Sequence, residues 1–351
     1  MSTIPNPKHV LIRAPNWIGD VVMATPAFRS VRKAFPTARI TLLIKSYARG
    51  IINDAPWFDG VIEYDPGRRH RGAAGYAAFV GELRKCRPDV ALLLVNSMRG
   101  AVEARLAGAK RIVGYDRSGR RVLLTDPVPP PRENGRIVPQ NMVDYYLRLC
   151  REMGCPPESR REELFVRPEL EGKADEFLAR HGRDASRPLV GINPGAAFGS
   201  SKCWLPERFA QVADAVIERH GCDVFICSAP SEKEIARTIQ SLMKHRPINP
   251  CDDNPGLEVY KAIIKRMRLL VTNDTGARHI AVAFGLPVVV IFGSTNTRYT
   301  DVNLERTRIV KAPNIDCAPC QRKICPTGTH RCMKEVTARM VIDAVDEMMK
   351  G

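Results

Sequence analysis

One pattern repeats over most of the chain: a short apolar run, a loop of small or polar residues, and then an amphipathic stretch. The apolar runs include His9–Arg13, Arg39–Ile44, Asp89–Val95, Leu269–Thr272 and Pro287–Phe292. Nearly continuous apolar strands that alternate with helices are typical of parallel sheets covered on both faces. Ligands of such sheets bind beyond the carboxyl ends of the strands. The pattern therefore predicts an α/β protein with its site in strand-to-helix loops.

A break in this pattern divides the chain into two α/β halves of similar size. The segment 126–132, Asp-Pro-Val-Pro-Pro-Pro-Arg, is a poor helix or strand because proline lacks a backbone N–H. The 351 residues also exceed what one ordinary core holds. We predict an N-terminal domain over residues 1–160, a C-terminal domain over 161–335 with a cleft between the two, and a final helix over 336–351.

The charge balance indicates polyanionic partners. Lys and Arg number 54 and Asp and Glu 38, which gives a net charge of +16 and suits nucleic acid, an anionic membrane face or a phosphate-rich substrate. Basic clusters at Arg68–Arg71 and Arg117–Arg121 lie in the first half. The chain shows no signature of a nucleic-acid-binding domain, no membrane-length apolar stretch and no signal-peptide pattern. We interpret it as a cytoplasmic protein whose partner is not nucleic acid.

The first candidate loop, Arg13–Asp20, lies where the first apolar run gives way to a helical pattern expected over Gly19–Phe35. Asp20 falls at the start of that helix, where exposed N–H groups and the helix dipole favour a carboxylate. A helix cap and a catalytic carboxylate are both consistent with this position. Trp17 in the same loop is typical of a lined pocket.

Two further loops in the second half are suited to anions. The first follows the apolar run 188–193 and contains Gly199, Ser200, Ser201 and Lys202. Backbone N–H groups and hydroxyls there can cradle phosphate oxygens, and the lysine can neutralise them. The second follows the run 269–272 and contains Asp274, Thr275 and Gly276, with His279 one helical turn later. Each loop alone is consistent with an ordinary turn before a helix. Together, the two loops favour a nucleotide diphosphate site.

Four cysteines gather near the C-terminus, at Cys317, Cys320, Cys325 and Cys332. Thiols at this density suit structural zinc, although only the first pair has the usual Cys-x-x-Cys spacing. Reduced thiols in a loop and local disulfides are the alternatives. We expect the cluster to lie outside the strand-end loops, so that catalysis does not depend on it.

These motifs together resemble glycosyltransferase family 9, the lipopolysaccharide heptosyltransferases, and within it the heptosyltransferase II type. The resemblance runs from about Val10 to Ile291, and its marks are Trp17-Ile-Gly-Asp20, Pro194–Trp204 and Thr272–Gly276 with His279. It implies the GT-B fold, two facing Rossmann-like domains with the last helix packing back on the first. It also implies transfer of L-glycero-D-manno-heptose from ADP-heptose to the inner-core heptose of lipopolysaccharide, with inversion and without a required cofactor.

The resemblance also implies roles for individual residues. Asp20 matches the family's catalytic base, and Lys202 its diphosphate-binding lysine. Glu232 falls near the family's nucleoside-contacting glutamate, and the nearby Glu234 is the alternative. The expected donor-binding residues are Gly199, Ser200, Ser201, Lys202, Glu232, Asp274, Thr275, Gly276 and His279, and the expected acceptor-binding residues are Asn96, Arg99 and Arg120.

The expected acceptor is heptosyl-Kdo2-lipid A, which the enzyme would meet as a peripheral protein at the inner face of the inner membrane. Two departures bear on fine donor specificity: Ala197 stands where such loops often have Glu, and Cys227–Pro230 replaces a Gly-Gly-x-Pro turn. A heptosyltransferase of type I or III remains an alternative. So do a non-catalytic protein that binds nucleotide sugars and a nucleic-acid-binding protein.

Overall fold

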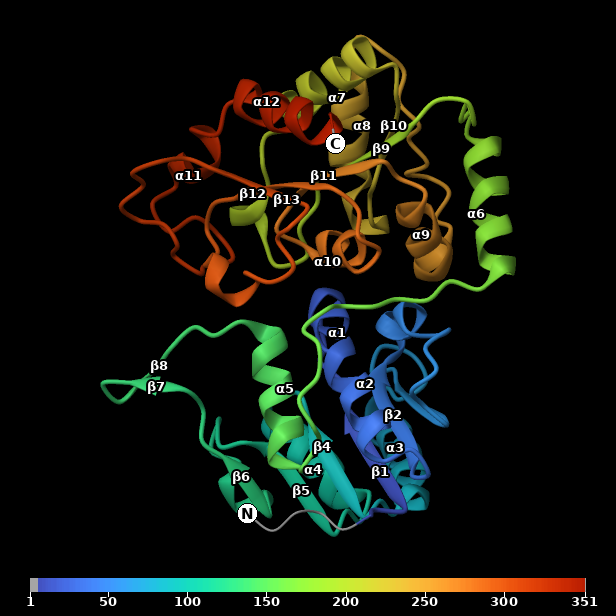
Figure 1. Ribbon diagram of the computed structural model, residues 1–351, viewed down its shortest axis with the longest axis vertical. Helices are drawn as coiled ribbons and strands as arrows, with labels where there is room; N and C mark the ends of the chain where they lie inside the picture. The colour runs from blue at the N-terminus through green and yellow to red at the C-terminus, as the bar shows by residue number, and fades with distance from the viewer. Residues whose placement is uncertain (1–5, 351) are drawn as a thin grey trace. The chain divides into compact units, whose positions relative to one another are not determined.

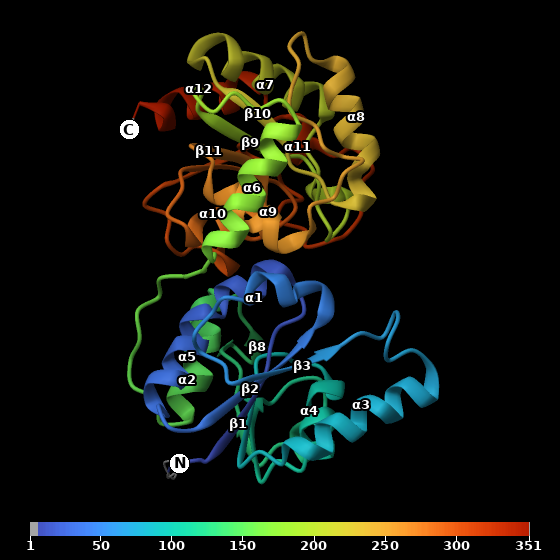
Figure 2. The ribbon, with the colours of Figure 1, turned by 90° about the vertical axis from the view of Figure 1, so that its right-hand side faces the viewer.

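The protein, seen here in a computed structural model that describes residues 6–350, divides into two compact units. The first extends to Phe165 and includes Arg298–Val302, whereas the second comprises Val166–Thr297 and the chain from Asn303 onward. Each unit is an α/β structure built on one parallel sheet (Figures 1 and 2). The predicted α/β fold class is thereby confirmed.

The first unit contains a six-stranded parallel sheet in the order β3-β2-β1-β4-β5-β6, which is the strand order of a Rossmann fold. Its strands are β1 (His9–Arg13), β2 (Arg39–Lys45), β3 (Gly60–Tyr64), β4 (Val90–Leu93), β5 (Arg111–Tyr115) and β6 (Asp126–Val128). Its helices are α1 (Ile18–Met23), α2 (Thr25–Ala34), α3 (Gly72–Cys86), α4 (Met98–Leu106) and α5 (Met142–Glu152), with short 3-10 turns η1 (Ser46–Ile51) and η2 (Arg121–Leu123). A small hairpin joins β7 (Arg132–Glu133) to β8 (Arg136–Ile137).

Two local expectations for this unit were wrong, and proline accounts for both. The single helix expected over Gly19–Phe35 is two helices that meet at Ala24, because Pro26 in the first turn of α2 has no N–H to continue the ladder. The proline-rich segment expected to be irregular contributes β6. Pro127 is accommodated there because β6 is an edge strand, which bonds on one side alone.

The second unit contains a five-stranded parallel sheet in the order β10-β9-β11-β12-β13. Its strands are β9 (Leu189–Asn193), β10 (Asp223–Ile226), β11 (Leu269–Asn273), β12 (Val288–Phe292) and β13 (Thr307–Lys311). Its helices are α6 (Pro168–Arg180), α7 (Pro206–His220), α8 (Lys233–Leu242), α9 (Gly256–Lys265), α10 (Gly276–Ala283), α11 (Arg331–Lys334) and α12 (Ala338–Met349), with 3-10 turns η3 (Ser200–Lys202) and η4 (Pro230–Glu232). A further turn, η5 (Thr297–Tyr299), spans the division between the units.

The core of the second unit lies between its sheet and the helices α7 and α12. Trp204, only 1% exposed, packs edge-on against Phe209 and donates its indole N–H to the carbonyl of Val336, 2.9 Å away. The last helix, α12, packs on α7 and on the strands β12 and β13 (Figure 1). The helix α12 thus belongs to the second unit. Its expected packing on the first domain stays a prediction.

Candidate active site

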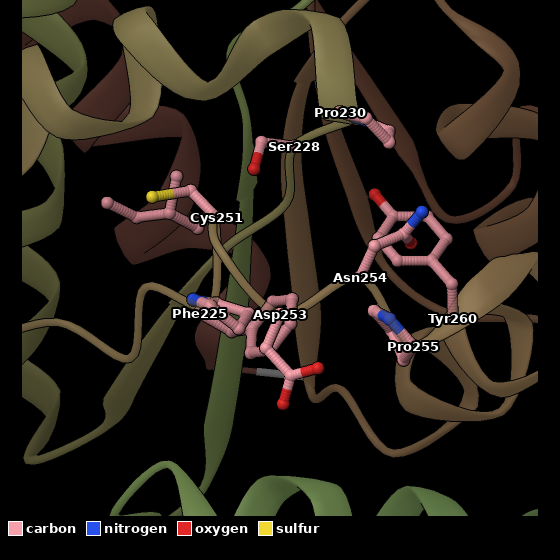
Figure 3. Close-up of a pocket in the computed structure, with 10 residues that line it drawn as sticks. Phe225, Ser228, Pro230, Cys251, Asp253, Asn254, Pro255 and Tyr260 are labelled. Carbon is pink, nitrogen blue, oxygen red and sulfur yellow. The ribbon is translucent and has the colours of Figure 1, made fainter.

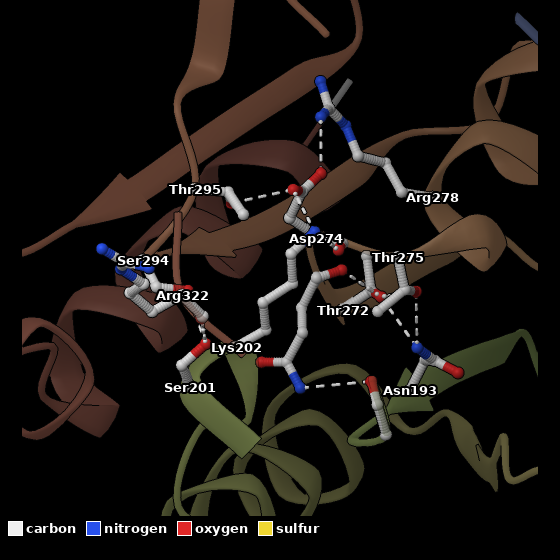
Figure 4. A network of polar contacts seen from close by, with 12 residues as sticks. Asn193, Ser201, Lys202, Thr272, Asp274, Thr275, Arg278, Ser294, Thr295 and Arg322 are labelled. Carbon is white, nitrogen blue, oxygen red and sulfur yellow. Dashed lines mark hydrogen bonds and ion pairs between the residues drawn. The ribbon is translucent and has the colours of Figure 1, made fainter. Parts of the chain in front are cut away.

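The loops after β9 and β11 meet through an ion pair between Lys202 and Asp274. The Lys202 ammonium lies 2.9 Å from the Asp274 carboxylate oxygen Oδ2 and also 2.9 Å from the Asp274 carbonyl oxygen (Figure 4). Both strands are parallel neighbours in the sheet, so their carboxyl ends lie at the same edge. The structure thereby brings together the two loops that the sequence predicted to form one anion site.

Asp274 is the centre of this network. Its side chain is 9% exposed, and it also contacts Arg278 at 3.3 Å and accepts a hydrogen bond of 2.9 Å from the Thr295 hydroxyl. Burial alone would raise the pKa of the Asp274 carboxyl, but the charges of Lys202 and Arg278 outweigh it and lower that pKa to about 2. Asp274 therefore stays ionised at neutral pH. This carboxylate holds the lysine in place and is unsuited to act as a base.

The amide of Asn193, the last residue of β9, connects the same two loops. It donates to the hydroxyls of Thr272 at 3.1 Å and Thr275 at 2.9 Å (Figure 4). Thr275 directly precedes α10, whose first residue is Gly276 and whose first turn carries the buried His279. The N-terminus of α10 therefore lies at the sheet edge, where the N–H groups of its first turn favour an anion.

The backbone conformation at position 199 requires glycine. Its φ of 152° is one that residues with a side chain rarely adopt, and a Cβ there would lie 2.3 Å from the carbonyl oxygen of Lys323. Ser200, Ser201 and Lys202 form η3, and Ser201 is buried, with 2% exposure. The Ser201 hydroxyl donates to the carbonyl of Arg322, so this side chain holds the loop, and its expected contact with the donor stays a prediction.

Glu232 is brought to the loop after β9. Its carboxyl group occupies the space beside Gly195, since a Cβ on that glycine would lie about 2.0 Å from it, and it accepts a hydrogen bond of 2.9 Å from the N–H of Ala229. Glu234 is exposed on the first turn of α8. The geometry thus favours Glu232 over Glu234 as a ligand contact.

A small pocket opens at the carboxyl end of β10 (Figure 3). Aromatic and proline side chains supply much of its lining, and polar groups come from Ser228, Asp253 and Asn254. Tyr260 contributes a ring from α9, and burial raises the pKa of its hydroxyl well above the usual value. A flat apolar group with a few polar edges fits such a lining.

In the first unit, Asp20 lies in the first turn of α1 and accepts a hydrogen bond of 2.9 Å from the Tyr146 hydroxyl of α5. Burial and the negative charge of Asp20 raise the pKa of the Tyr146 hydroxyl well above its usual value, so it remains a donor at neutral pH. Trp17 precedes this helix without a side-chain cap and is 51% exposed. The hydrogen bond from Tyr146 helps to orient the Asp20 carboxylate.

The three expected acceptor residues differ in their surroundings. Arg99 is half exposed, lies 3.5 Å from Glu103 and stacks its guanidinium over the ring of Tyr64. Asn96 is partly buried and accepts a hydrogen bond of 3.2 Å from the hydroxyl of Tyr145. Both side chains lie near the carboxyl end of β4, where ligands of such sheets bind.

Arg120, the third of these residues, is completely buried, and its expected contact with the acceptor stays a prediction. Its guanidinium donates to the carbonyls of Tyr115 at 3.0 Å, Val95 at 2.5 Å and Ser97 at 3.3 Å. Burial lowers its pKa to about 10, which still leaves it charged at neutral pH. Arg120 therefore connects the loop after β5 to the loop after β4, where it bonds to the residues on either side of Asn96.

The comparisons with known proteins place the chain in a family. The profile of "Glycosyltransferase family 9 (heptosyltransferase)" matches residues 76–330. The chain belongs to this family. It is a glycosyltransferase, as the sequence motifs predicted. A lipooligosaccharide heptosyltransferase 2 of Haemophilus influenzae is 23% identical over 97% of this chain and 99% of its own, and the lipopolysaccharide heptosyltransferase 2 of Escherichia coli is 22% identical over 97% and 98%.

Solved structures of family 9 members share the fold. A family 9 glycosyltransferase from Veillonella parvula has a TM-score of 0.86, with 24% identity over 98% of this chain and 97% of its own. Heptosyltransferase II of E. coli has a TM-score of 0.78, with 22% identity over 97% and 98%. The predicted GT-B class, with two Rossmann-like domains, is confirmed by these likenesses.

The C-terminal cysteines of this family 9 chain lie in a segment that contacts the loop after β9. Within residues 6–350, no group of three or more His, Cys, Asp or Glu side chains is arranged to hold a metal ion, so the zinc hypothesis gains no support. The cysteines are free thiols. The cysteines lie outside the strand-end loops in the sequence, but Lys323 and His330 of the same segment bond to Ser201 in the loop after β9.

The basic cluster Arg68–Arg71 of the first unit contains both exposed and buried side chains. Arg68, Arg69 and Arg71 are exposed, but His70 is 3% exposed and stacks on the ring of Tyr64. Among the described residues, no helix is long and apolar enough to span a membrane. The exposed arginines leave a cationic surface on this unit of the glycosyltransferase.

Proposed function

We propose that this glycosyltransferase moves L-glycero-D-manno-heptose from ADP-heptose to the inner-core heptose of heptosyl-Kdo2-lipid A, with inversion at the anomeric carbon. The observation that carries the proposal is the Lys202–Asp274 pair, set between two anion-binding loops at the edge of the second sheet. The relatives named lipopolysaccharide heptosyltransferase 2 support the acceptor class. A related E. coli heptosyltransferase, WaaC, has been solved with ADP-2-deoxy-2-fluoro heptose, which supports the donor.

The diphosphate of the donor would lie against the N-terminus of α10 and the ammonium of Lys202. An ammonium has three N–H donors, and Asp274 accepts from it at two atoms, so a donor remains for a phosphate oxygen. Glu232 would bind the ribose hydroxyls, and the pocket beside Tyr260 would take the adenine. As ADP departs, Lys202 and the helix N–H groups stabilise the charge that develops on the diphosphate.

Asp20 would act as the general base. The acceptor hydroxyl attacks the anomeric carbon, the bond from that carbon to the diphosphate oxygen breaks, and ADP leaves with the electron pair. The proton of the hydroxyl passes to the Asp20 carboxylate. Tyr146, which donates to Oδ1 of that carboxylate, would hold it so that the other oxygen faces the hydroxyl.

The acceptor is proposed to bind the first unit at the loop of Asn96 and Arg99. The exposed arginines at positions 68, 69 and 71 would contact the phosphorylated acceptor or the anionic membrane that holds it. A heptosyltransferase 3 type reaction is the second candidate, because the E. coli enzyme of that name is 24% identical over 79% of this chain.

The test is an assay of purified protein for ADP release, with a panel of donors and acceptors. ADP-heptose is compared with other nucleotide sugars, and acceptors with no, one or two inner-core heptoses are compared with each other. We expect rapid release with ADP-heptose and the acceptor that carries one heptose, and a product inverted at the anomeric centre by NMR. Preference for the acceptor with two heptoses would favour the type III reaction, and release independent of any acceptor would refute transfer.

A further inference from the structure

The cysteine-rich segment from Cys317 to Cys332 is attached to the loop that carries Lys202. Ser201, the neighbour of Lys202, donates its N–H to the carbonyl of Lys323 at 3.1 Å and its hydroxyl to the carbonyl of Arg322 (Figure 4). The carbonyl of Ser201 accepts a third hydrogen bond of 3.1 Å from the Nε2–H of His330. Every polar group of this buried serine is thus bonded to the segment.

We propose that His330 is a positioning residue for the donor loop: it holds Ser201, and through Ser201 it fixes Lys202 beside Asp274. The inference rests on the proposed role of Lys202 in binding the donor diphosphate. It assigns a function to a part of the chain that lies outside the strand-end motifs.

His330 has a left-handed backbone, which its side chain tolerates. Its φ is 54° and its ψ is 30°, a conformation in which asparagine, aspartate and histidine are enriched among residues with a side chain. A turn that needed this conformation alone would be served at lower strain by glycine or asparagine. The imidazole adds what glycine cannot supply, namely the bond to Ser201.

Cys325 fixes the turn from which His330 projects. Its sulfur accepts the backbone N–H of His330 at 3.4 Å and lies 3.4 Å from the hydroxyl of Thr327. These hydrogen bonds lower the pKa of the Cys325 thiol to about 7. A chain of contacts therefore runs from Cys325 through His330 and Ser201 to Lys202.

Three variants separate positioning from folding. His330→Gly removes the imidazole and relieves the backbone. His330→Gln places an amide N–H near the position of the imidazole Nε2–H, and His245→Ala removes a surface histidine paired with Glu218 as a matched control. The readouts are the dissociation constant of ADP, the KM values of ADP-heptose and of the acceptor, the melting temperature, and hydrogen exchange of the amides at 199–203.

We expect His330→Gly to weaken ADP binding and to raise the KM of ADP-heptose by about three- to tenfold, the effect of one hydrogen bond. The acceptor KM and the melting temperature should stay close to those of the wild type, while exchange at 199–203 becomes faster. His330→Gln should recover most of the donor affinity, and His245→Ala should match the wild type throughout.

Two results would overturn the proposal. One is unchanged ADP affinity and unchanged exchange at 199–203 in a folded His330→Gly protein. The other is an equal loss in His330→Gly and His330→Gln with a lowered melting temperature, which would make His330 a fold element. Failure of the wild type itself to bind ADP would instead refute the proposed function, so the two failures are distinguishable.

Discussion

Replacement of Lys202 by methionine is predicted to destabilise the second unit because it leaves Asp274 as a buried charge with one cation fewer. The two side chains are 14% and 9% exposed, so the pair is largely desolvated. Removal of one partner from such a pair costs about 3–5 kcal/mol. Arg278 at 3.3 Å and the Thr295 hydroxyl at 2.9 Å still compensate the carboxylate. We therefore expect Lys202→Met to lower the free energy of unfolding by about 2–3 kcal/mol at pH 7.

The matched control is the double variant Lys202→Met with Asp274→Asn, which removes both charges. It should unfold at higher urea concentration than the single variant, because no uncompensated carboxylate remains. Urea unfolding followed by Trp204 fluorescence, with Trp17 and Trp57 replaced by phenylalanine, reports on the unit that contains the pair. A single variant within about 0.5 kcal/mol of the wild type, or a double variant no more stable than the single one, would refute this reasoning.

The free energy of unfolding is expected to fall at acid pH because of Asp274. The wild-type Asp274 carboxyl has a pKa of about 2, below its value of about 3.9 in the unfolded chain. Its contribution to stability is therefore fully present above pH 4 and is lost as the pH falls from about 4 to about 2. Without Lys202 the pKa of this carboxyl rises, so the stability difference between wild type and Lys202→Met should be largest at neutral pH and should shrink toward pH 4.

Three further predictions concern a buried arginine and the two ligands. Arg120→Met should lower the free energy of unfolding by about 2–4 kcal/mol, measured by urea unfolding, because it breaks three buried hydrogen bonds to carbonyls. Glu232→Gln should weaken ADP binding by about tenfold in calorimetry while Glu234→Gln leaves it unchanged, and equal effects would count against the assignment of Glu232. The acceptor KM should rise with ionic strength more steeply than the KM of ADP-heptose, because exposed arginines on the first unit are screened by salt; parallel salt responses would contradict this division.

The sheets and the donor loops could be predicted because their signals are local. Most of the parallel strands are apolar runs, and the loops after β9 and β11 begin directly at the end of such a run, so the position of Lys202 and Asp274 at a sheet edge follows from the sequence alone. The strand β13 was missed because its sequence, Thr-Arg-Ile-Val-Lys, has only two apolar residues, and it lies at a partly exposed edge of the sheet.

Two features of the site could not be predicted because they depend on distant contacts. Arg120 lies in a sequence cluster with Arg117 and Arg121 that reads as a solvated surface, yet its guanidinium is buried under carbonyls from three separate positions. The bonds between Ser201 and residues 322–330 join positions more than a hundred residues apart. No pattern within either segment indicates the other.

The central claim is that Asp20 takes the proton of the acceptor hydroxyl, and acceptor-dependent ADP release by Asp20→Asn tests it most directly. Asparagine keeps the size of the side chain and can still accept the hydrogen bond from Tyr146, but it cannot take up the proton. The account predicts a folded protein with normal ADP affinity and a kcat reduced by about a hundredfold or more. A folded Asp20→Asn protein with turnover near that of the wild type would contradict the mechanism and leave Asp20 as part of the first turn of α1.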